Sequence, residues 1–151
     1  CRLIDQFDEV VPRGRLYAEM EAEFGSALPR LIDEIRSWPL WIKTDEFLLV
    51  HAGMAPGVRL KNQPVEWLTN IRTWDGIGED LNRPKSDPAW FDCVDYDRLI
   101  VFGHWAQMMG VERDDVVGLD TGCVYGGRLS ALILPERTVV SVKASTSYCV
   151  I

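Results

Sequence analysis

Three short apolar runs, each followed at once by a polar or glycine-rich turn, constrain the fold of this chain more than any other feature. The runs cover residues 47–50, 99–102 and 116–119. None contains a polar side chain, and continuous runs of this length are typical of strands buried on both faces of a sheet. Strands outnumber helices in the second half of the chain. We therefore predict a mixed α/β domain with sheet packed on sheet.

The remaining elements follow from periodicity and from turn residues. Apolar side chains in 28–35 recur at i, i+3, i+4 and i+7, which predicts an amphipathic helix with Ser26 as its N-cap and Pro39 beyond its end. The other predicted elements are helices over 16–24 and 64–70, a strand over 40–43 with a turn at 44–45, a loop excursion over 74–97, and a hairpin of 129–134 with 139–142.

The composition limits the function classes. The chain has 151 residues, 47% of them hydrophobic and 26% charged, which is enough for one domain with a core. Its formal charge of −7 argues against non-specific nucleic-acid binding, because phosphate backbones require a basic surface. A small anionic substrate is still compatible with this charge where metal ions supply the positive charge.

Cysteine usage and hydropathy bear on the compartment. Cys1, Cys93, Cys123 and Cys149 are scattered and form no CxxC pair, so we expect reduced thiols and a cytoplasmic protein. No apolar run approaches the roughly 18–20 residues that would span a bilayer, and no signal peptide is visible. The sequence opens on Cys1 rather than on methionine, from which we expect that another segment precedes it.

Both histidines of the chain occupy the same kind of position. His51 follows the first run in Leu-Val-His-Ala-Gly, and His104 follows the second in Phe-Gly-His-Trp-Ala. Ligand-binding groups gather at the carboxyl ends of strands in open α/β sheets, and paired imidazoles there are typical metal ligands. The alternative is that each is an ordinary core or loop histidine. Two ligands are also fewer than a structural or catalytic zinc ion takes.

Three segments carry a family resemblance. LLVHAGMAPG, IVFGHWA and GLDTGCVYGGRLSAL, in this order, resemble the carboxyl-terminal half of calcineurin-like metallophosphoesterases. The similarity is to the phosphoprotein-phosphatase-type branch that contains bacterial symmetrical diadenosine tetraphosphatases, and it covers residues 28–142. It implies a four-layer α/β/β/α sandwich with a mixed sheet. It also implies hydrolysis of phosphate esters or anhydrides with two divalent metal ions.

The amino-terminal motifs of that family have no counterpart in this sequence. Family members begin with GDxHG, GDxxDRG and GNH motifs, which supply the ligands of one metal, a bridging aspartate, an asparagine and a histidine that acts on the leaving group. The resemblance therefore implies that residues 1–151 are a metallophosphoesterase domain lacking its amino-terminal metal-binding half. We expect this stretch alone to be inactive and to bind at most one metal ion.

The resemblance assigns roles to four residues. His51 and His104 match the histidines that bind the second metal, for which manganese is favoured and iron, zinc, cobalt and nickel suit imidazole too. Arg72 matches an arginine that grips the substrate phosphate, as a planar guanidinium can do through two oxygens; the alternative is a surface salt bridge. Tyr125 lies in a loop that lines the family's site, where it would bond a phosphate oxygen or serve in packing.

Three further residues have structural interpretations that we favour. Asp120 ends a buried strand, where it orients a ligand histidine or caps its own loop. Cys123 has no activating neighbour in the sequence and is interpreted as structural. Trp105 directly follows His104 and is interpreted as a core or rim residue, the alternative being a stacking partner for a nucleobase.

The favoured function is hydrolysis of diadenosine tetraphosphate or a related dinucleoside polyphosphate. A Ser/Thr phosphoprotein phosphatase of the same family stays open, because the segment between Arg72 and Leu99 does not match the diadenosine tetraphosphatases. A third alternative is a truncated, non-catalytic phosphoesterase-like binding domain. The expected partner is a small anionic phosphate compound, with no nucleic acid and no membrane, and the sequence leaves the oligomeric state unknown.

Overall fold

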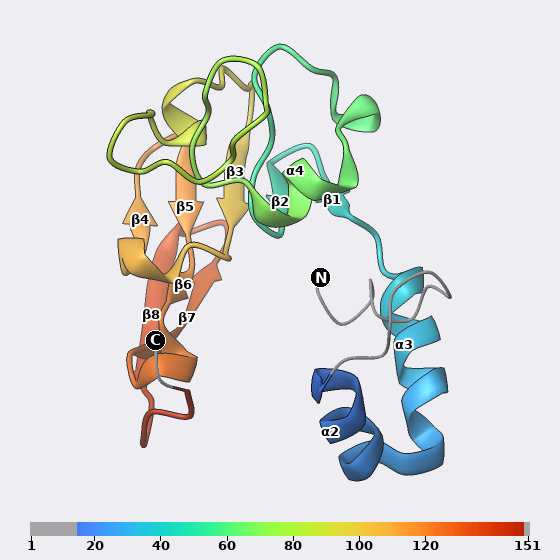
Figure 1. Ribbon diagram of the computed structural model, residues 1–151. Coiled ribbons are helices and arrows are strands. Elements are labelled where there is room, and N and C mark those ends of the chain that lie inside the picture. Colours follow the sequence, from blue (N-terminus) through green and yellow to red (C-terminus); the bar gives the residue numbers. More distant parts are fainter. Residues whose placement is uncertain (1–14, 150–151) are drawn as a thin grey trace. The chain divides into compact units, whose positions relative to one another are not determined.

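The computed structural model describes residues 15–149, which fall into two compact units divided between Pro39 and Leu40 (Figure 1). The described part of the first unit is a pair of helices, α2 (Arg15–Phe24) and α3 (Leu28–Ser37), joined by the 3-10 turn η1 (Gly25–Ala27). Tyr17, Leu28 and Ile32 form its small buried core, with Met20 packed against them. The helices predicted over 16–24 and 28–35 are thus present.

The predicted capping of α3 by Ser26 is wrong. The N-cap is Ala27, and it makes no side-chain capping bond. Gly25, at a φ of +52°, lets the chain turn directly out of α2, so that Ser26 lies within the 3-10 turn. Proline in the first turn then fixes the start of α3 at Leu28, because proline needs no hydrogen-bond acceptor there.

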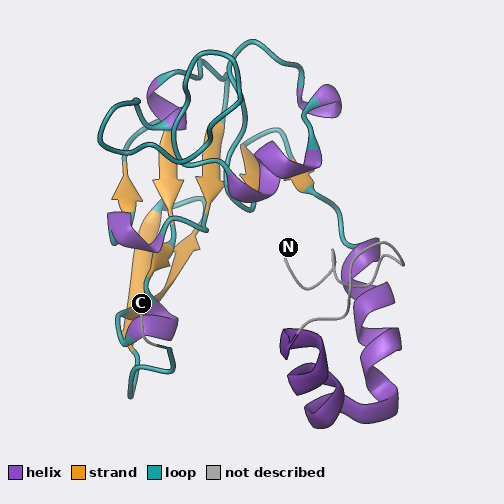
Figure 2. Cartoon of the chain, in the orientation of Figure 1, coloured by secondary structure: helices purple, strands orange, loops and turns teal. Residues whose placement is uncertain are grey.

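The second unit is built on a five-stranded mixed sheet in the order β1-β2-β3-β5-β4; Figure 1 labels these strands and Figure 2 colours all strands orange. Its strands are β1 (Trp41–Lys43), β2 (Phe47–Val50), β3 (Leu99–Phe102), β4 (Val111–Glu112) and β5 (Val116–Gly118). The three central strands, β2, β3 and β5, are parallel, and the edge strands β1 and β4 run antiparallel to their neighbours. All four residues of β3 are buried, as the continuous apolar run predicted.

A second sheet packs on one face of the first. It is antiparallel and contains β6 (Asp120–Thr121), β7 (Arg128–Ile133) and β8 (Thr138–Lys143). Leu132 and Val139 from this sheet pack against a buried cluster that includes Val101 and Val117 of the first. The prediction of a mixed α/β fold with sheet packed on sheet is confirmed. The outer face of the β7–β8 hairpin stays exposed within residues 40–149, with Leu129 and Val142 more than 60% accessible.

The opposite face of the five-stranded sheet carries the main core. It is covered by α4 (Val65–Asn70) and by the loop excursion over 74–97, which holds the 3-10 turn η3 (Trp90–Asp92). Trp90 is fully buried, and its ring packs edge-on against Phe102 of β3 at a centroid distance of 5.3 Å. Packing on this face therefore holds β3 and α4 in place, and the loops that follow them reach the carboxyl edge of the sheet.

The structure also bears on the predicted state of the cysteines and on the predicted absence of a membrane span. Cys93, Cys123 and Cys149 are free thiols in the structure, as predicted, whereas Cys1 lies outside the described residues. Burial raises the pKa of the Cys93 thiol, so this cysteine is held in its unreactive protonated form. Within residues 15–149 no helix has the length and apolarity needed to cross a membrane.

Substituting Gly53 by alanine should destabilise the second unit by about 3 kcal/mol, at the upper end of the cost of overpacking a core. A methyl group on Gly53 would overlap the ring of Trp90, which is fully buried and cannot move aside. Urea unfolding measured by tryptophan fluorescence checks this. Gly57→Ala is the control: a methyl group there meets no atom within 4 Å, and only its φ of +71° is unfavourable, which costs about 1 kcal/mol. Equal losses in the two variants would contradict the packing argument.

Candidate active site

The carboxyl ends of β2, β3 and β5 bring three polar side chains to one edge of the sheet. Because these strands are parallel neighbours, the residues that follow them emerge on the same side. His51 directly follows β2, His104 comes two residues after β3, and Asp120 two residues after β5. The backbone N–H of Gly103 donates to the carbonyl of His51 at 2.8 Å and ties the first two loops together.

The two imidazoles lie against each other although 53 positions separate them in the sequence. Their ring centroids are 5.2 Å apart and their planes are inclined by 56°. Two imidazoles bound to one tetrahedral ion have centroids about 5 Å apart, since each metal–nitrogen bond is about 2.1 Å long. The observed spacing of His51 and His104 therefore fits a shared divalent ion.

His104 is held in the form that can bind a metal. Partial burial, followed by the positive charge of Arg72, lowers its pKa to about 4, so the ring is neutral at pH 7. Its Nε2 lies 3.2 Å from the carbonyl oxygen of Asn70. A carbonyl can only accept, so Nε2 carries the proton and Nδ1 keeps a free lone pair. Backbone carbonyls commonly orient ligand histidines in this way.

His51 has the same protonation state for a similar reason. Desolvation by the surrounding chain is the largest effect on its pKa, which lies below the ordinary value of 6.5, and the negative charge of Asp120 opposes the shift. His51 is nevertheless among the exposed residues of the chain. A neutral ring that faces solvent, beside the small residues Ala52 and Gly53, can accept an ion that arrives from solution.

Arg72 points its charge at this edge. It follows α4 by two residues; the fully buried Ile71, with extended backbone, caps the helix and directs the chain away from it. The Arg72 amide donates to Leu81, and its carbonyl accepts from Trp90 at 3.1 Å, so its backbone is fixed on both sides. Its charge is close enough to depress the pKa of His104.

The Nε of Arg72 is buried and has no hydrogen-bond partner in the described part of the chain. The Nε of Arg98 is in the same state, but the Arg98 guanidinium also forms an ion pair with Asp97. A buried donor without a partner is costly, which is why such groups call for an explanation. An anion bound beside His104 would satisfy it. The surface salt bridge considered as the alternative for Arg72 is not among the ion pairs of residues 15–149.

The other singled-out residues occupy supporting positions. An Asp120 side-chain oxygen accepts from the amide of Gly122 at 3.1 Å, so the aspartate caps its own loop, as the sequence suggested. Trp105 is buried in the main core and is not available to a ligand, which agrees with the core interpretation. Cys123 and Tyr125 lie in the 3-10 turn η5 (Cys123–Tyr125), where the Cys123 side chain is half-buried and that of Tyr125 is 40% exposed.

One functional group was missed in the sequence, the carbonyl of Asn70. The role of a backbone carbonyl does not depend on residue type, so it leaves no signal in the sequence. It becomes visible only in the structure, where the end of α4 lies against the loop that follows β3. The sequence was also silent on the left-handed conformation of His104, at a φ of +66°.

The described residues supply an incomplete metal shell. Between residues 15 and 149 no group of three or more His, Cys, Asp or Glu side chains is placed to hold an ion. His51 and His104 thus provide two ligands, whereas a catalytic ion takes about three from the protein.

Comparisons with known proteins agree with the fold and with the motifs. No family model matches the chain. A symmetrical bis(5'-nucleosyl)-tetraphosphatase of Janthinobacterium sp. (strain Marseille) is 32% identical, in an alignment covering 75% of this chain and 61% of that protein. One of the same name from Bordetella pertussis is 51% identical over 63 residues, 40% of this chain and 23% of that protein. A third, from Methylobacillus flagellatus, is 27% identical over 73% of this chain and 61% of its own length.

A solved structure has the same fold. It is the crystal structure of a protein assigned provisionally as a diadenosine tetraphosphatase, with a TM-score of 0.63 at 24% identity, covering 83% of this chain and 66% of that one. The chain therefore has the mixed α/β fold of that structure, as the sequence predicted. In sequence it is similar to symmetrical bis(5'-nucleosyl)-tetraphosphatases, which its motifs also resemble, and it spans about three-fifths of the length of the curated relatives it matches.

Proposed function

We propose that this chain is part of a metal-dependent hydrolase of dinucleoside polyphosphates, with diadenosine tetraphosphate as the favoured substrate. The observation that carries the proposal is the meeting of two neutral imidazoles and one buried, unpartnered guanidinium nitrogen at a single sheet edge. The names of the homologues support a tetraphosphatase.

Each residue has a defined task in this proposal. His51 and His104 would hold one divalent ion, which would supply Lewis-acid activation of the phosphoryl group when bound. Asn70 keeps the His104 ring in the tautomer that leaves Nδ1 free. Arg72 binds two phosphoryl oxygens through its planar fork and neutralises charge that grows on them during the transfer.

The metal and the remaining machinery are also proposed. Manganese is the favoured ion, and iron, zinc, cobalt and nickel suit the same nitrogen ligands. We propose that residues 1–151 form a metallophosphoesterase domain that lacks the amino-terminal ligands of a second metal ion. Free thiols and an acidic composition fit a cytoplasmic protein.

The test is hydrolysis of diadenosine tetraphosphate in the presence of manganese, with the products separated by ion exchange. The longest natural form of the chain should convert each substrate molecule into two molecules of ADP, the outcome of symmetrical cleavage. The polypeptide of residues 1–151 should show no turnover of the same substrate or of p-nitrophenyl phosphate, because its described residues bring together two candidate ligands, His51 and His104, and a catalytic ion takes about three.

Three other outcomes would refute the proposal. Release of ATP and AMP would mean asymmetric cleavage. Turnover of a phosphoserine peptide in preference to the dinucleotide would favour the phosphoprotein phosphatase. No turnover of any phosphate ester by the longest form would leave a binding domain as the function.

A further inference from the structure

The loop that carries His104 also presents two methionines to solvent. Trp105 and Ala106 are buried and anchor the loop in the core, whereas Met108 is 40% exposed and Met109 60% exposed. Met109 holds the left-handed conformation, at a φ of +54°, which is uncommon outside glycine. The loop is thus fixed at one point and turns its unbranched apolar side chains outward, next to a candidate metal ligand.

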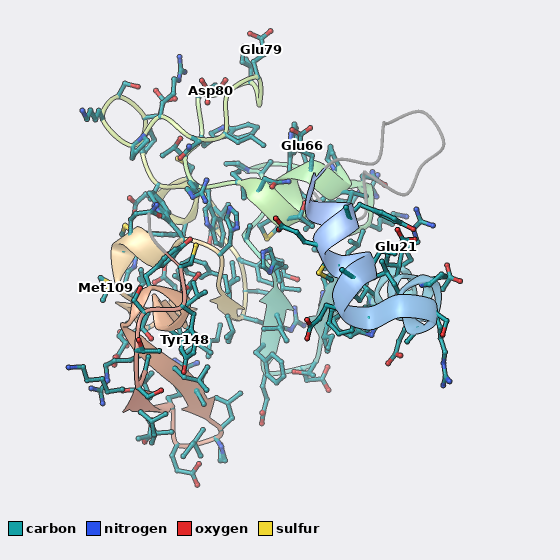
Figure 3. All side chains as sticks on the ribbon, turned by 60° about the horizontal axis from the view of Figure 1, so that its bottom comes forward. Glu21, Glu66, Glu79, Asp80, Met109 and Tyr148 are labelled. Carbon is teal, nitrogen blue, oxygen red and sulfur yellow. The ribbon has the colours of Figure 1, made fainter. Side chains whose placement is uncertain are left out.

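These methionines adjoin the candidate site. Met108, Gly103 and Asp120 line the same small gap, which has no room for a water molecule, at the carboxyl edge of the sheet. A methyl group placed on Gly122 would lie 3.6 Å from Met109 Sδ and 4.0 Å from Tyr125 Cδ2. The Met109 thioether and the Tyr125 ring therefore flank Gly122, in the loop that Asp120 caps (Figure 3 labels Met109).

We propose that Met108, Met109 and Tyr125 form a stacking surface for a purine base of the nucleotide substrate. This methionine–tyrosine surface deepens the proposed function and rests on it, since the phosphates of the same molecule would lie at His51, His104 and Arg72. The occupant follows from continuity: an apolar, aromatic surface that begins at the end of a phosphate site suits a ligand that is anionic at one end and flat and aromatic at the other.

The side-chain chemistry of Met108, Met109 and Tyr125 suits a purine base. A tyrosine ring stacks on any base because every base has a π-face. Thioethers are polarizable and unbranched, so they adapt to the edge of an aromatic ring. None of the three side chains carries a charged group that would discriminate between base edges, so the surface should accept adenine and guanine with similar affinity.

The methionines make the test direct. The chain has four, and the ε-methyl groups of a 13C-methyl-methionine sample report on each. Titration with ADP should shift the Met108 and Met109 signals through the ring current of the base. Met54, which is buried, and Met20, in the first unit, are internal controls and should stay unshifted. Ribose 5-phosphate with pyrophosphate, which supplies the phosphates without a base, should leave all four signals in place.

Substitutions separate stacking from phosphate binding by Tyr125. Tyr125→Leu should weaken ADP binding by about five- to tenfold, at the low end of the loss for one stacked base. Tyr125→Phe should restore most of that affinity, because the ring is kept and only the hydroxyl is lost. Ile77→Ala is the matched control, since Ile77 is 68% exposed and apolar but belongs to the loop over 74–97.

Each result of these two experiments either supports or contradicts the stacking surface. Shifts at Met108 and Met109 that appear with ADP alone, together with rescue by phenylalanine, support the stacking surface. Absence of such shifts, equal shifts with ribose 5-phosphate, or loss of affinity in Tyr125→Phe as large as in Tyr125→Leu would overturn it. The proposed function is tested separately, by the release of ADP from diadenosine tetraphosphate. The two tests are independent, because the longest form can hydrolyse the dinucleotide without these shifts and the shifts can occur without hydrolysis.

Discussion

Arg72→Ala is expected to lower kcat for diadenosine tetraphosphate about 10²–10³-fold in the longest natural form of the chain. The positive charge of Arg72 is close enough to lower the pKa of His104, and its buried Nε has no partner in the described residues. Its contribution should grow as negative charge spreads over the transferring phosphoryl oxygens. Removal of one preorganised donor from such a site costs roughly 2.7–4 kcal/mol. Steady-state kinetics at saturating manganese measure the loss.

The control for Arg72 separates charge from geometry. Arg72→Lys should recover only part of the loss, because an ammonium is a point charge and cannot reproduce the planar fork. Metal content and the free energy of unfolding should stay close to those of the unsubstituted protein, since Arg72 is not a ligand and its backbone bonds survive substitution. A variant with normal kcat, or one that loses its metal, would show that Arg72 has another role.

The central strands could be predicted because burial on both faces leaves a mark in the sequence. β2 and β3 have the bounds that the apolar runs indicated, and the hairpin of β7 and β8 differs from its predicted bounds by one residue at each of its four ends. The strands β4 and β6 were missed. Each has only two residues, and Asp120 and Thr121 of β6 gain strand geometry from pairing with β7, which is a tertiary effect.

The sequence could predict the side chains of the candidate site but not the backbone groups and turns that position them. Two histidines in equivalent positions at strand ends indicated that they would meet, and they do. The sequence could not show which nitrogen of His104 stays free, because that depends on the Asn70 carbonyl at the end of α4. The place of Met109 was equally hidden: a methionine near a histidine is ordinary until the left-handed turn brings it beside Gly122.

Substituting either candidate ligand should weaken divalent metal binding to the 151-residue chain by at least about 100-fold. Even the outer partners of ligand histidines contribute 10–100-fold to metal affinity, so loss of one ligand itself should cost no less. His51→Ala and His104→Ala should have similar effects, because the two rings lie 5.2 Å apart and would share one ion. Titration with Co²⁺, followed by its visible absorption, measures both affinity and stoichiometry.

The number of ions bound per chain tests the shared metal site more directly than the affinity does. The unsubstituted chain should bind one ion, because His51 and His104 would share it and residues 15–149 contain no cluster of three or more His, Cys, Asp or Glu side chains. Arg72→Ala is the control: the positive charge that depresses the pKa of His104 is removed, so Co²⁺ should bind at least as well as before. A single histidine substitution that leaves the affinity unchanged would exclude that histidine as a ligand. Two ions per chain would mean that a metal site exists which neither the sequence motifs nor the sheet edge reveal.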